Sequence, residues 1–110
     1  MKVLISDKIH EAGIKILEEN GFKPEKKYSL NQEELSKEIQ NFEAIIVRSR
    51  TKLSAKILIK AKKLRIIVRA GVGLDNIDLK KAEELGITVS NTPKAPSVSV
   101  AELTMGLILS

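Results

Sequence analysis

The residues best placed for binding chemistry are Arg69 and the glycine turn that follows it. Residues 66–68, Ile-Ile-Val, form a continuous β-branched run, which is typical of a strand buried on both faces of a parallel sheet. Arg69 ends that run, and Gly71 and Gly73 follow it, so the backbone there can approach a bound group closely and turn its N–H groups toward an anion. The stretch predicts a ligand-binding loop, with a simple tight turn as the alternative.

A second candidate pair, Arg48-Ser49, follows the apolar run Ala-Ile-Ile-Val at residues 44–47. In an open parallel sheet ligands bind beyond the carboxyl ends of the strands, which puts this pair, Ser6-Asp7 and the Arg69 turn at one edge. A guanidinium pairs with carboxylate or phosphate in bidentate fashion. The two arginines therefore predict a site for a small anionic substrate, although a structural ion pair with Asp7 or Asp75 is the alternative for each arginine alone.

The glycine turn does not match the dinucleotide-binding fingerprint. That motif needs a third glycine, and Asn76 stands at its position. It also needs an acid about 20 residues further on for the ribose, and the sequence has no Asp or Glu between Glu84 and Glu102. We therefore expect a ligand loop that does not bind adenosine.

Five strand and helix units are expected to position these loops. The predicted strands cover residues 3–5, 22–28, 44–47, 66–68 and 87–89. The second is a weak strand interrupted by Pro24, as an edge strand is, while Asn31-x-x-Glu34 and Asp78 provide helix starts. Such regular alternation predicts an α/β fold, a flavodoxin-like parallel sheet of about five strands in the order 2-1-3-4-5, with helices on both faces.

The last predicted helix, residues 98–109, is apolar around almost its whole circumference. Ser99-x-x-Glu102 gives it a capping-box start, which favours a structural role for Glu102, and no stop signal precedes Ser110. We therefore expect one domain over residues 1–110, truncated inside its last helix. The apolar helix is expected to pack against a missing domain or a second subunit rather than against this core alone, so a homodimer is predicted.

Composition excludes several classes of function. The 110 residues carry a net charge of +5, but lysines alternate with glutamates and only 3% of residues are aromatic, so a solvated helix surface is expected rather than nucleic-acid binding. The sequence has no cysteine for a disulfide, a thiolate nucleophile or a zinc site. No segment reaches the ~18 apolar residues of a membrane span, and no signal peptide is visible, so a cytoplasmic protein is expected. His10, the only histidine, falls at the start of the first helix, where a surface or capping role is expected rather than catalysis.

Three stretches carry a resemblance to a known family. They are Val47-Arg48-Ser49 with Thr51, residues 69–78 (RAGVGLDNID), and Asn91-Thr92-Pro93 with residues 97–104 (SVSVAELT). Together they resemble the amino-terminal part of the D-2-hydroxyacid dehydrogenases along the whole chain. The resemblance implies a substrate-binding domain, completed in the family by a carboxyl-terminal segment and hinged to a nucleotide-binding domain that binds NAD. It places five residues on the substrate side: Arg48, Ser49, Arg69, Ala70 and Gly71. It places Val72 at the nicotinamide end of NAD.

The resemblance also implies an activity for the intact protein, an NAD-dependent oxidation of a 2-hydroxy acid. The expected substrate is 3-phosphoglycerate, in serine biosynthesis. A sister dehydrogenase for glyoxylate, hydroxypyruvate or lactate is one alternative, and a non-enzymatic, NAD-sensing corepressor-like module is another. The family's catalytic Arg, Glu and His lie further along, so these 110 residues alone are expected to be inactive and to hold no catalytic or metal-binding residue. Arg50 stands where close relatives often carry a small residue, which leaves open an extra cationic contact or surface variation.

Overall fold

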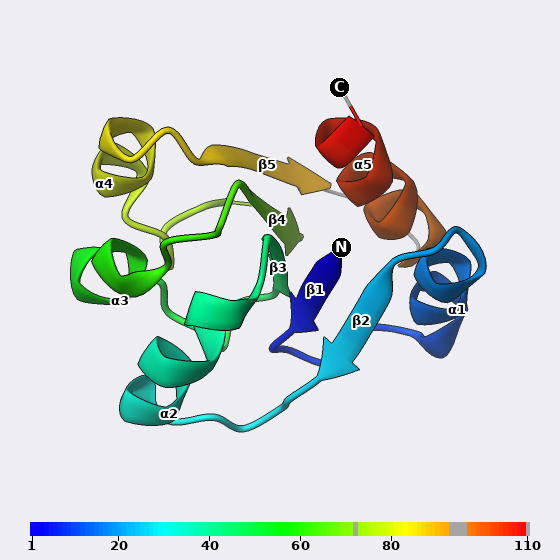
Figure 1. Ribbon diagram of the computed structural model, residues 1–110, viewed down its shortest axis with the longest axis horizontal. Coiled ribbons are helices and arrows are strands. Elements are labelled where there is room, and N and C mark those ends of the chain that lie inside the picture. Colours follow the sequence, from blue (N-terminus) through cyan, green and yellow to red (C-terminus); the bar gives the residue numbers. More distant parts are fainter. Residues whose placement is uncertain (72, 93–96, 110) are drawn as a thin grey trace.

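The β-branched runs form the middle of one parallel sheet (Figure 1). The computed structural model describes residues 1–71, 73–92 and 97–109. Within them the strands are β1 (Lys2–Ile5), β2 (Lys23–Lys26), β3 (Ala44–Val47), β4 (Ile66–Ala70) and β5 (Thr88–Thr92). All neighbouring strands are parallel and their order is β2-β1-β3-β4-β5, which confirms the predicted fold class and strand order.

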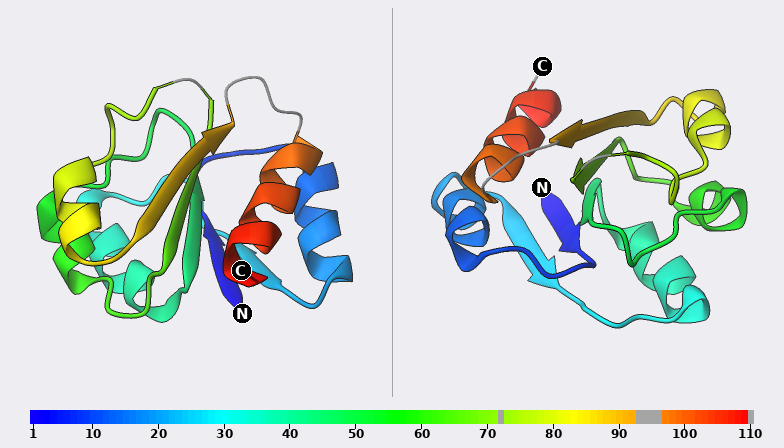
Figure 2. Two further views of the ribbon diagram at one scale, coloured as in Figure 1. Left: turned by 90° about the horizontal axis from the view of Figure 1, so that it is seen from above. Right: turned by 180° about the vertical axis from the view of Figure 1, so that it is seen from behind.

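Helices cover both faces of the sheet (Figure 2). They are α1 (Glu11–Glu19), α2 (Gln32–Glu38), the short 3-10 helix η1 (Ile39–Asn41), α3 (Ala55–Lys60), α4 (Leu79–Glu84) and α5 (Ser97–Leu109). Helices α1 and α5 lie on one face, whereas α2, α3 and α4 lie on the other (Figure 2). The predicted starts are confirmed, because Asn31 and Glu34 form a capping box and Asp78 accepts a hydrogen bond from the Lys81 amide.

Alternate side chains of the central strands build two apolar layers. Leu4, Ile45 and Ile67 face the layer under α2, α3 and α4, while Ile46 and Val68 face the layer under α1 and α5. All five are fully buried, as expected for strands covered on both faces. The predicted edge strand is also confirmed, since Pro24 lies in β2 at the rim of the sheet, where a missing N–H is tolerated.

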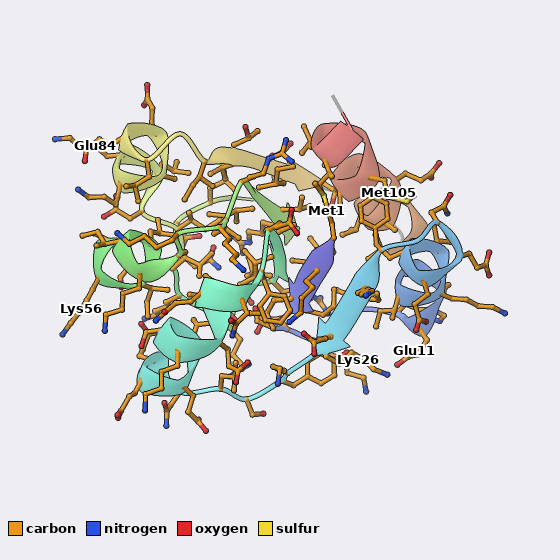
Figure 3. The ribbon with its side chains drawn as sticks, viewed as in Figure 1. Met1, Glu11, Lys26, Lys56, Glu84 and Met105 are labelled. Atoms are coloured by element: carbon orange, nitrogen blue, oxygen red, sulfur yellow. The ribbon has the colours of Figure 1, made fainter. Side chains whose placement is uncertain are left out.

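The charged residues lie mainly on the outer surfaces of the helices. Lys56 on α3 and Glu84 on α4 point away from the sheet (Figure 3). Glu11 of α1 forms an ion pair of 3.0 Å with Lys26 of β2, and this carboxylate raises the pKa of Lys26 above its usual value. Such pairs are typical of a solvated helix surface.

Two expectations about element boundaries need correction. The fifth strand, predicted to cover residues 87–89, begins at Thr88 and continues to Thr92, because Asn91 and Thr92 pair with β4 at the half-buried edge, where polar side chains are tolerated. Helix α5 begins at Ser97, so Ser99 lies inside the helix and is not its capping residue.

Helix α5 was expected to pack mainly outside this core, yet one side of it packs within the same chain. Val100, Ala101, Thr104 and Ile108 are buried, and the helix packs against α1 and β4 of the same chain. The physical reason is the width of the sheet, because α1 alone does not cover five strands and α5 fills the rest of that face (Figure 2). The helix is therefore part of this domain's own core.

Candidate functional site

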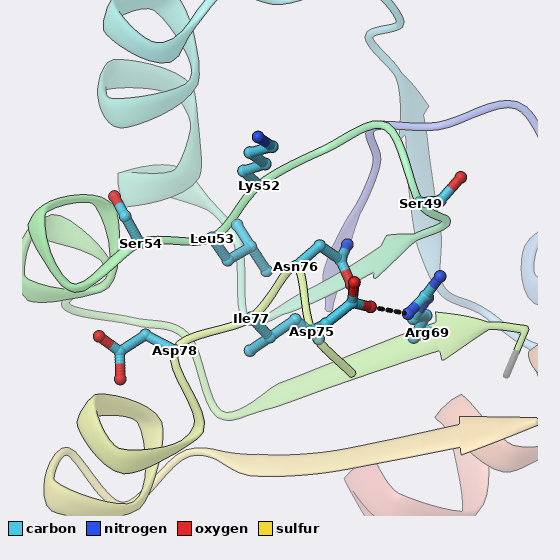
Figure 4. Close-up of a pocket in the computed structure, with 9 residues that line it drawn as sticks. All are labelled: Ser49, Lys52, Leu53, Ser54, Arg69, Asp75, Asn76, Ile77 and Asp78. Carbon is cyan, nitrogen blue, oxygen red and sulfur yellow. Dashed lines mark hydrogen bonds and ion pairs between the residues drawn. The ribbon is translucent and has the colours of Figure 1, made fainter. Parts of the chain in front are cut away.

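The candidate site lies at the carboxyl-terminal edge of the sheet, between the loops that follow β3 and β4. A cavity of about 480 Å³ opens there (Figure 4). It is lined by Ser49, Lys52, Leu53, Ser54, Arg69, Asp75, Asn76, Ile77 and Asp78. Ser49 and Arg69, both predicted from the sequence, lie toward the same end of it (Figure 4). This is the edge at which parallel α/β sheets bind ligands.

The guanidinium of Arg69 has little compensation for its charge. Arg69 is only 8% exposed, and its Nη1 forms an ion pair of 3.1 Å with Oδ1 of Asp75, whose side chain is 95% exposed. Its Nε is buried and has no hydrogen-bond partner within the described part of the chain. A buried donor without an acceptor is costly, and a solvated carboxylate offsets little of that cost. The side chain is therefore suited to an anion that enters the cavity.

The glycine turn after β4 wraps around that guanidinium. Gly71 and Gly73 have φ angles of +146° and +83°, which L side chains rarely adopt. A Cβ at Gly73 would lie 3.4 Å from Nη1 of Arg69. The glycines predicted that the backbone approaches a bound group closely, and in the structure it approaches the Arg69 side chain. Ala70, the last residue of β4, is half-buried beside the turn.

The loop 48–51 is fixed by Asp7, which the sequence analysis placed at this edge but did not count as a site residue. Oδ2 of Asp7 accepts hydrogen bonds from the backbone N–H groups of Arg48 at 2.7 Å and Thr51 at 3.0 Å. Oδ1 accepts a further bond of 2.6 Å from the Thr51 hydroxyl. A polar pair directly after a buried strand was the available signal, but its partners lie about 40 residues away in sequence.

Asn76 links the two loops from the other side. Its Nδ2 donates to the carbonyl oxygens of Arg48 and Thr51, each at 2.7 Å. Its Oδ1 is buried and has no partner among the described residues. In the sequence, Asn76 is visible only as the residue that stands in place of the third glycine of a fingerprint. In the structure this side chain orders the neighbouring loop.

The two predicted arginines do not converge on the cavity. Arg69 pairs in register with Val47, so Arg48, the first residue after β3, leaves on the opposite side of the sheet. The Arg48 guanidinium is exposed and donates to the Lys8 carbonyl oxygen at 3.4 Å, and it is not among the residues that line the cavity.

Arg50 turns back toward the end of β1. Its Nε lies 3.3 Å from Oδ1 of Asp7, and its Nη2 donates to the Ser6 carbonyl oxygen at 3.1 Å. Of the ion pairs considered as alternatives for the arginines, the pair of Arg69 with Asp75 is present. Asp7 pairs with Arg50 and not with the Arg48 side chain.

The end of β5 supports the glycine turn. Asn91 donates from Nδ2 to the Gly71 carbonyl oxygen at 3.3 Å, and the Thr92 hydroxyl donates to the Arg69 carbonyl oxygen at 3.5 Å. Both residues lie beyond the predicted end of the fifth strand at residue 89. Val72, the residue expected at the nicotinamide end of NAD, lies outside the described residues, as does Pro93.

Comparison with known families gives one match that covers most of the chain. Residues 3–105 match the family model described as D-isomer specific 2-hydroxyacid dehydrogenase, catalytic domain.

In the described residues no helix is long and apolar enough to cross a membrane. The same residues contain no group of three or more His, Cys, Asp or Glu side chains arranged to hold a metal ion.

Curated relatives carry names from the same family. The D-3-phosphoglycerate dehydrogenase of Methanocaldococcus jannaschii is 51% identical over 99% of this chain, and the human protein of that name is 47% identical over 98%. A hydroxypyruvate reductase of Thermotoga maritima is 55% identical over 73% of this chain. This chain spans only about a fifth of the first two relatives, 21% and 20%, and 26% of the third.

Solved structures are also similar to this chain. An NAD+-bound 3-phosphoglycerate dehydrogenase from Entamoeba histolytica has a TM-score of 0.77 at 33% identity, covering 84% of this chain and 33% of that one. A Pyrococcus horikoshii protein has a TM-score of 0.80 at 34% identity, covering 98% of this chain and 32% of that one.

Proposed function

Because this chain belongs to the D-isomer specific 2-hydroxyacid dehydrogenase family, we propose that it is the substrate-binding domain of an NAD-dependent member, D-3-phosphoglycerate dehydrogenase. The reaction is the oxidation of 3-phosphoglycerate to 3-phosphohydroxypyruvate, in serine biosynthesis and in the cytoplasm. Residues 1–110 bind and orient the substrate. The remainder of the enzyme, which makes up most of the length of the relatives, contains the nucleotide-binding domain.

The observation that carries this proposal is the state of Arg69. Its buried guanidinium keeps one N–H without an acceptor and has an exposed carboxylate as its ion-pair partner, at the edge of the sheet where this fold binds ligands. An entering carboxylate or phosphate accepts charge-assisted hydrogen bonds from this guanidinium where it lines the cavity. Ser49, at the same end of the cavity, adds a hydroxyl that donates to the same anion.

The names of the relatives favour a phosphorylated substrate over a simple 2-hydroxy acid, since those at 51% and 47% identity are D-3-phosphoglycerate dehydrogenases. Lys52 and Arg69 line the cavity together with Asp75 and Asp78, so the lining itself has no excess of positive charge. The identity to the Thermotoga maritima hydroxypyruvate reductase favours hydroxypyruvate as the alternative substrate.

The described residues do not fit the adenosine half of NAD. Asn76, at the position of the third fingerprint glycine, donates both of its amide N–H groups to the loop 48–51 instead of leaving an open cradle for a pyrophosphate. We therefore place the dinucleotide in the rest of the enzyme, with Val72 at its nicotinamide end. NAD supplies the hydride acceptor when bound, and the acid/base His and the Arg that polarises the substrate come from that remainder.

We also propose that the chain forms a homodimer through the outer side of α5. Leu103, Met105 and Leu107 pack partly against the core but remain half-exposed. Ile108 of the same helix is buried in the chain's own core. Sedimentation equilibrium of the chain tests this proposal, with a dimer expected at high micromolar concentration and a persistent monomer overturning it.

A panel of ligands tests the proposed activity. Calorimetric titration of the chain is expected to rank 3-phosphoglycerate above hydroxypyruvate, glyoxylate and D-lactate, and the chain alone is expected to reduce no NAD with any hydroxy acid. Equal affinity for the unphosphorylated acids would favour the sister dehydrogenases. Binding of none of them would favour a corepressor-like module that uses this fold for protein contacts.

A further inference from the structure

We propose that Asp7 is a positioning residue, whose carboxylate holds the loop 48–51 so that Ser49 meets the anionic substrate; this inference rests on the proposed function. Asp7 follows β1, which pairs with β3, and it is only 3% exposed. Three donors of the loop converge on this one carboxylate, namely the N–H groups of Arg48 and Thr51 and the Thr51 hydroxyl. Such a cluster is costly to bury unless its geometry is complete.

Two side chains, Asp7 and Asn76, hold both ends of the loop 48–51. Asp7 accepts from the N–H groups of Arg48 and Thr51, and Asn76 donates to the carbonyl oxygens of the same two residues. Four backbone groups that no sheet ladder reaches are thereby satisfied. The residues between the two anchors, Ser49 and Arg50, are exposed, and Ser49 lines the cavity at the end where Arg69 lies (Figure 4).

The negative charge of Asp7 is offset by the guanidinium of Arg50. The Arg50 side chain is 54% exposed, yet its Nε and Nη2 both point back to the end of β1, at Asp7 and Ser6. In this arrangement Arg50 is the counterion of the anchor. The Thr51 hydroxyl, which is also 3.0 Å from the Ser6 hydroxyl, closes the cluster on the buried side.

Three variants separate a positioning role of Asp7 from the general loss of stability that follows when a buried residue is changed. In Asp7→Asn, the amide oxygen can replace Oδ2 as the acceptor of both backbone N–H groups, while the amide nitrogen can donate to the Thr51 hydroxyl. In Asp7→Ala, all acceptors are lost. Leu17→Ala is the matched control, because Leu17 is fully buried under the opposite face of the sheet, away from the cavity.

The experiment uses the chain with 3-phosphoglycerate as the probe, followed by ¹⁵N chemical-shift titration, with amide hydrogen exchange measured in parallel. Asp7→Ala is expected to raise exchange at the Arg48 and Thr51 amides and to weaken binding about tenfold or more, the usual consequence of losing charge-assisted hydrogen bonds. Asp7→Asn is expected to restore the dissociation constant to within about threefold of the wild type, since neutral hydrogen bonds replace charge-assisted ones. Leu17→Ala is expected to lose stability without a change in affinity.

Three results would overturn the inference: unchanged affinity in folded Asp7→Ala, a loss of affinity equal to that of Leu17→Ala, or unchanged exchange at the two anchored amides. Should Asp7→Ala not fold, Thr51→Val decides, because it removes only the hydroxyl of the cluster and is expected to weaken binding by less than the tenfold expected of Asp7→Ala, since the two backbone N–H anchors remain. A wild-type chain that binds no 3-phosphoglycerate would refute the proposed function, whereas the exchange rates would still decide whether Asp7 holds the loop.

Discussion

Arg69→Met is expected to weaken substrate binding without weakening the fold. The change removes the guanidinium and keeps an unbranched apolar side chain of similar length. Losing a hydrogen bond to a charged group costs about 1.5–3 kcal/mol, which corresponds to about a 10- to 150-fold higher dissociation constant for 3-phosphoglycerate. A substrate that makes two parallel bonds to the guanidinium puts the expected loss at the upper end.

The expected effect on stability has the opposite direction. The Arg69–Asp75 pair joins a buried guanidinium to an almost fully exposed carboxylate, so its loss is expected to cost about 0–1 kcal/mol. Removing the buried Nε that lacks a partner relieves about 1–3 kcal/mol. The free energy of unfolding is therefore expected to stay constant or to rise.

Two assays on the same variant separate these effects: chemical-shift titration with 3-phosphoglycerate for affinity, and urea unfolding followed by circular dichroism for stability. Arg65→Met is the matched control, because Arg65 is exposed and precedes the opposite end of β4. It is expected to leave affinity unchanged. Unchanged affinity in Arg69→Met, or a loss of about 3 kcal/mol or more in its stability, as for a broken buried pair, would refute the reasoning.

Further predictions concern the neighbours of this guanidinium and one distant tyrosine. Asp75→Asn is expected to raise the affinity for 3-phosphoglycerate up to about fivefold, because an exposed competitor worth about 1 kcal/mol is removed; weaker binding in the same titration would show that Asp75 helps to hold the substrate. Gly73→Ala is expected to lower the free energy of unfolding by about 1–2 kcal/mol, since its φ of +83° strains any L side chain, and an unchanged urea midpoint would contradict this. Burial raises the pKa of Tyr28, the only tyrosine, so absorbance titration is expected to give a midpoint above about 10. Because the folded state then holds this proton more tightly than the unfolded state, its contribution to stability is complete below about pH 10 and is lost as the pH rises through the raised pKa; the loss should shrink in Tyr28→Phe, and an identical loss in both proteins would argue against it.

The sheet could be predicted from the sequence because its central strands have a simple pattern. The apolar run at 44–47 coincides with β3, and the run at 66–68 lies within β4. Strands buried on both faces are mostly apolar, so the first charged side chain marks the end of β3, whereas β4 continues through Arg69 to Ala70. The half-buried edge strand β5 lacks this signal, which is why its last residues, Asn91 and Thr92, were not predicted to belong to it.

The edge of the sheet that holds the site could also be predicted, but not which side chains meet there. Arg48 and Arg69 both end strands, yet a register offset of one residue sends their side chains to different sides of the sheet. Register depends on pairing between strands that are distant in sequence, and a single sequence does not encode it locally. The prediction therefore brought together two arginines that the structure separates.

The anchors of the loop 48–51 escaped prediction for a related reason. Asp7 bonds to residues 41 and 44 positions away, and Asn76 to residues 28 and 25 positions away. Neither residue type is unusual where it stands, since Asp and Asn are common in loops. Only the folded sheet, which places the ends of β1, β3 and β4 side by side, shows what these two side chains hold.

The central claim is that the described cavity at the carboxyl-terminal edge of the sheet binds 3-phosphoglycerate through Arg69 and Ser49. A residue-resolved ¹⁵N titration of the wild-type chain with 3-phosphoglycerate tests it most directly. Saturable shifts are expected in residues 48–54 and 69–78 and at the end of β5, with α1 and α2 unaffected. Absence of saturable shifts, or shifts confined to surface lysines of the helices, would contradict the claim.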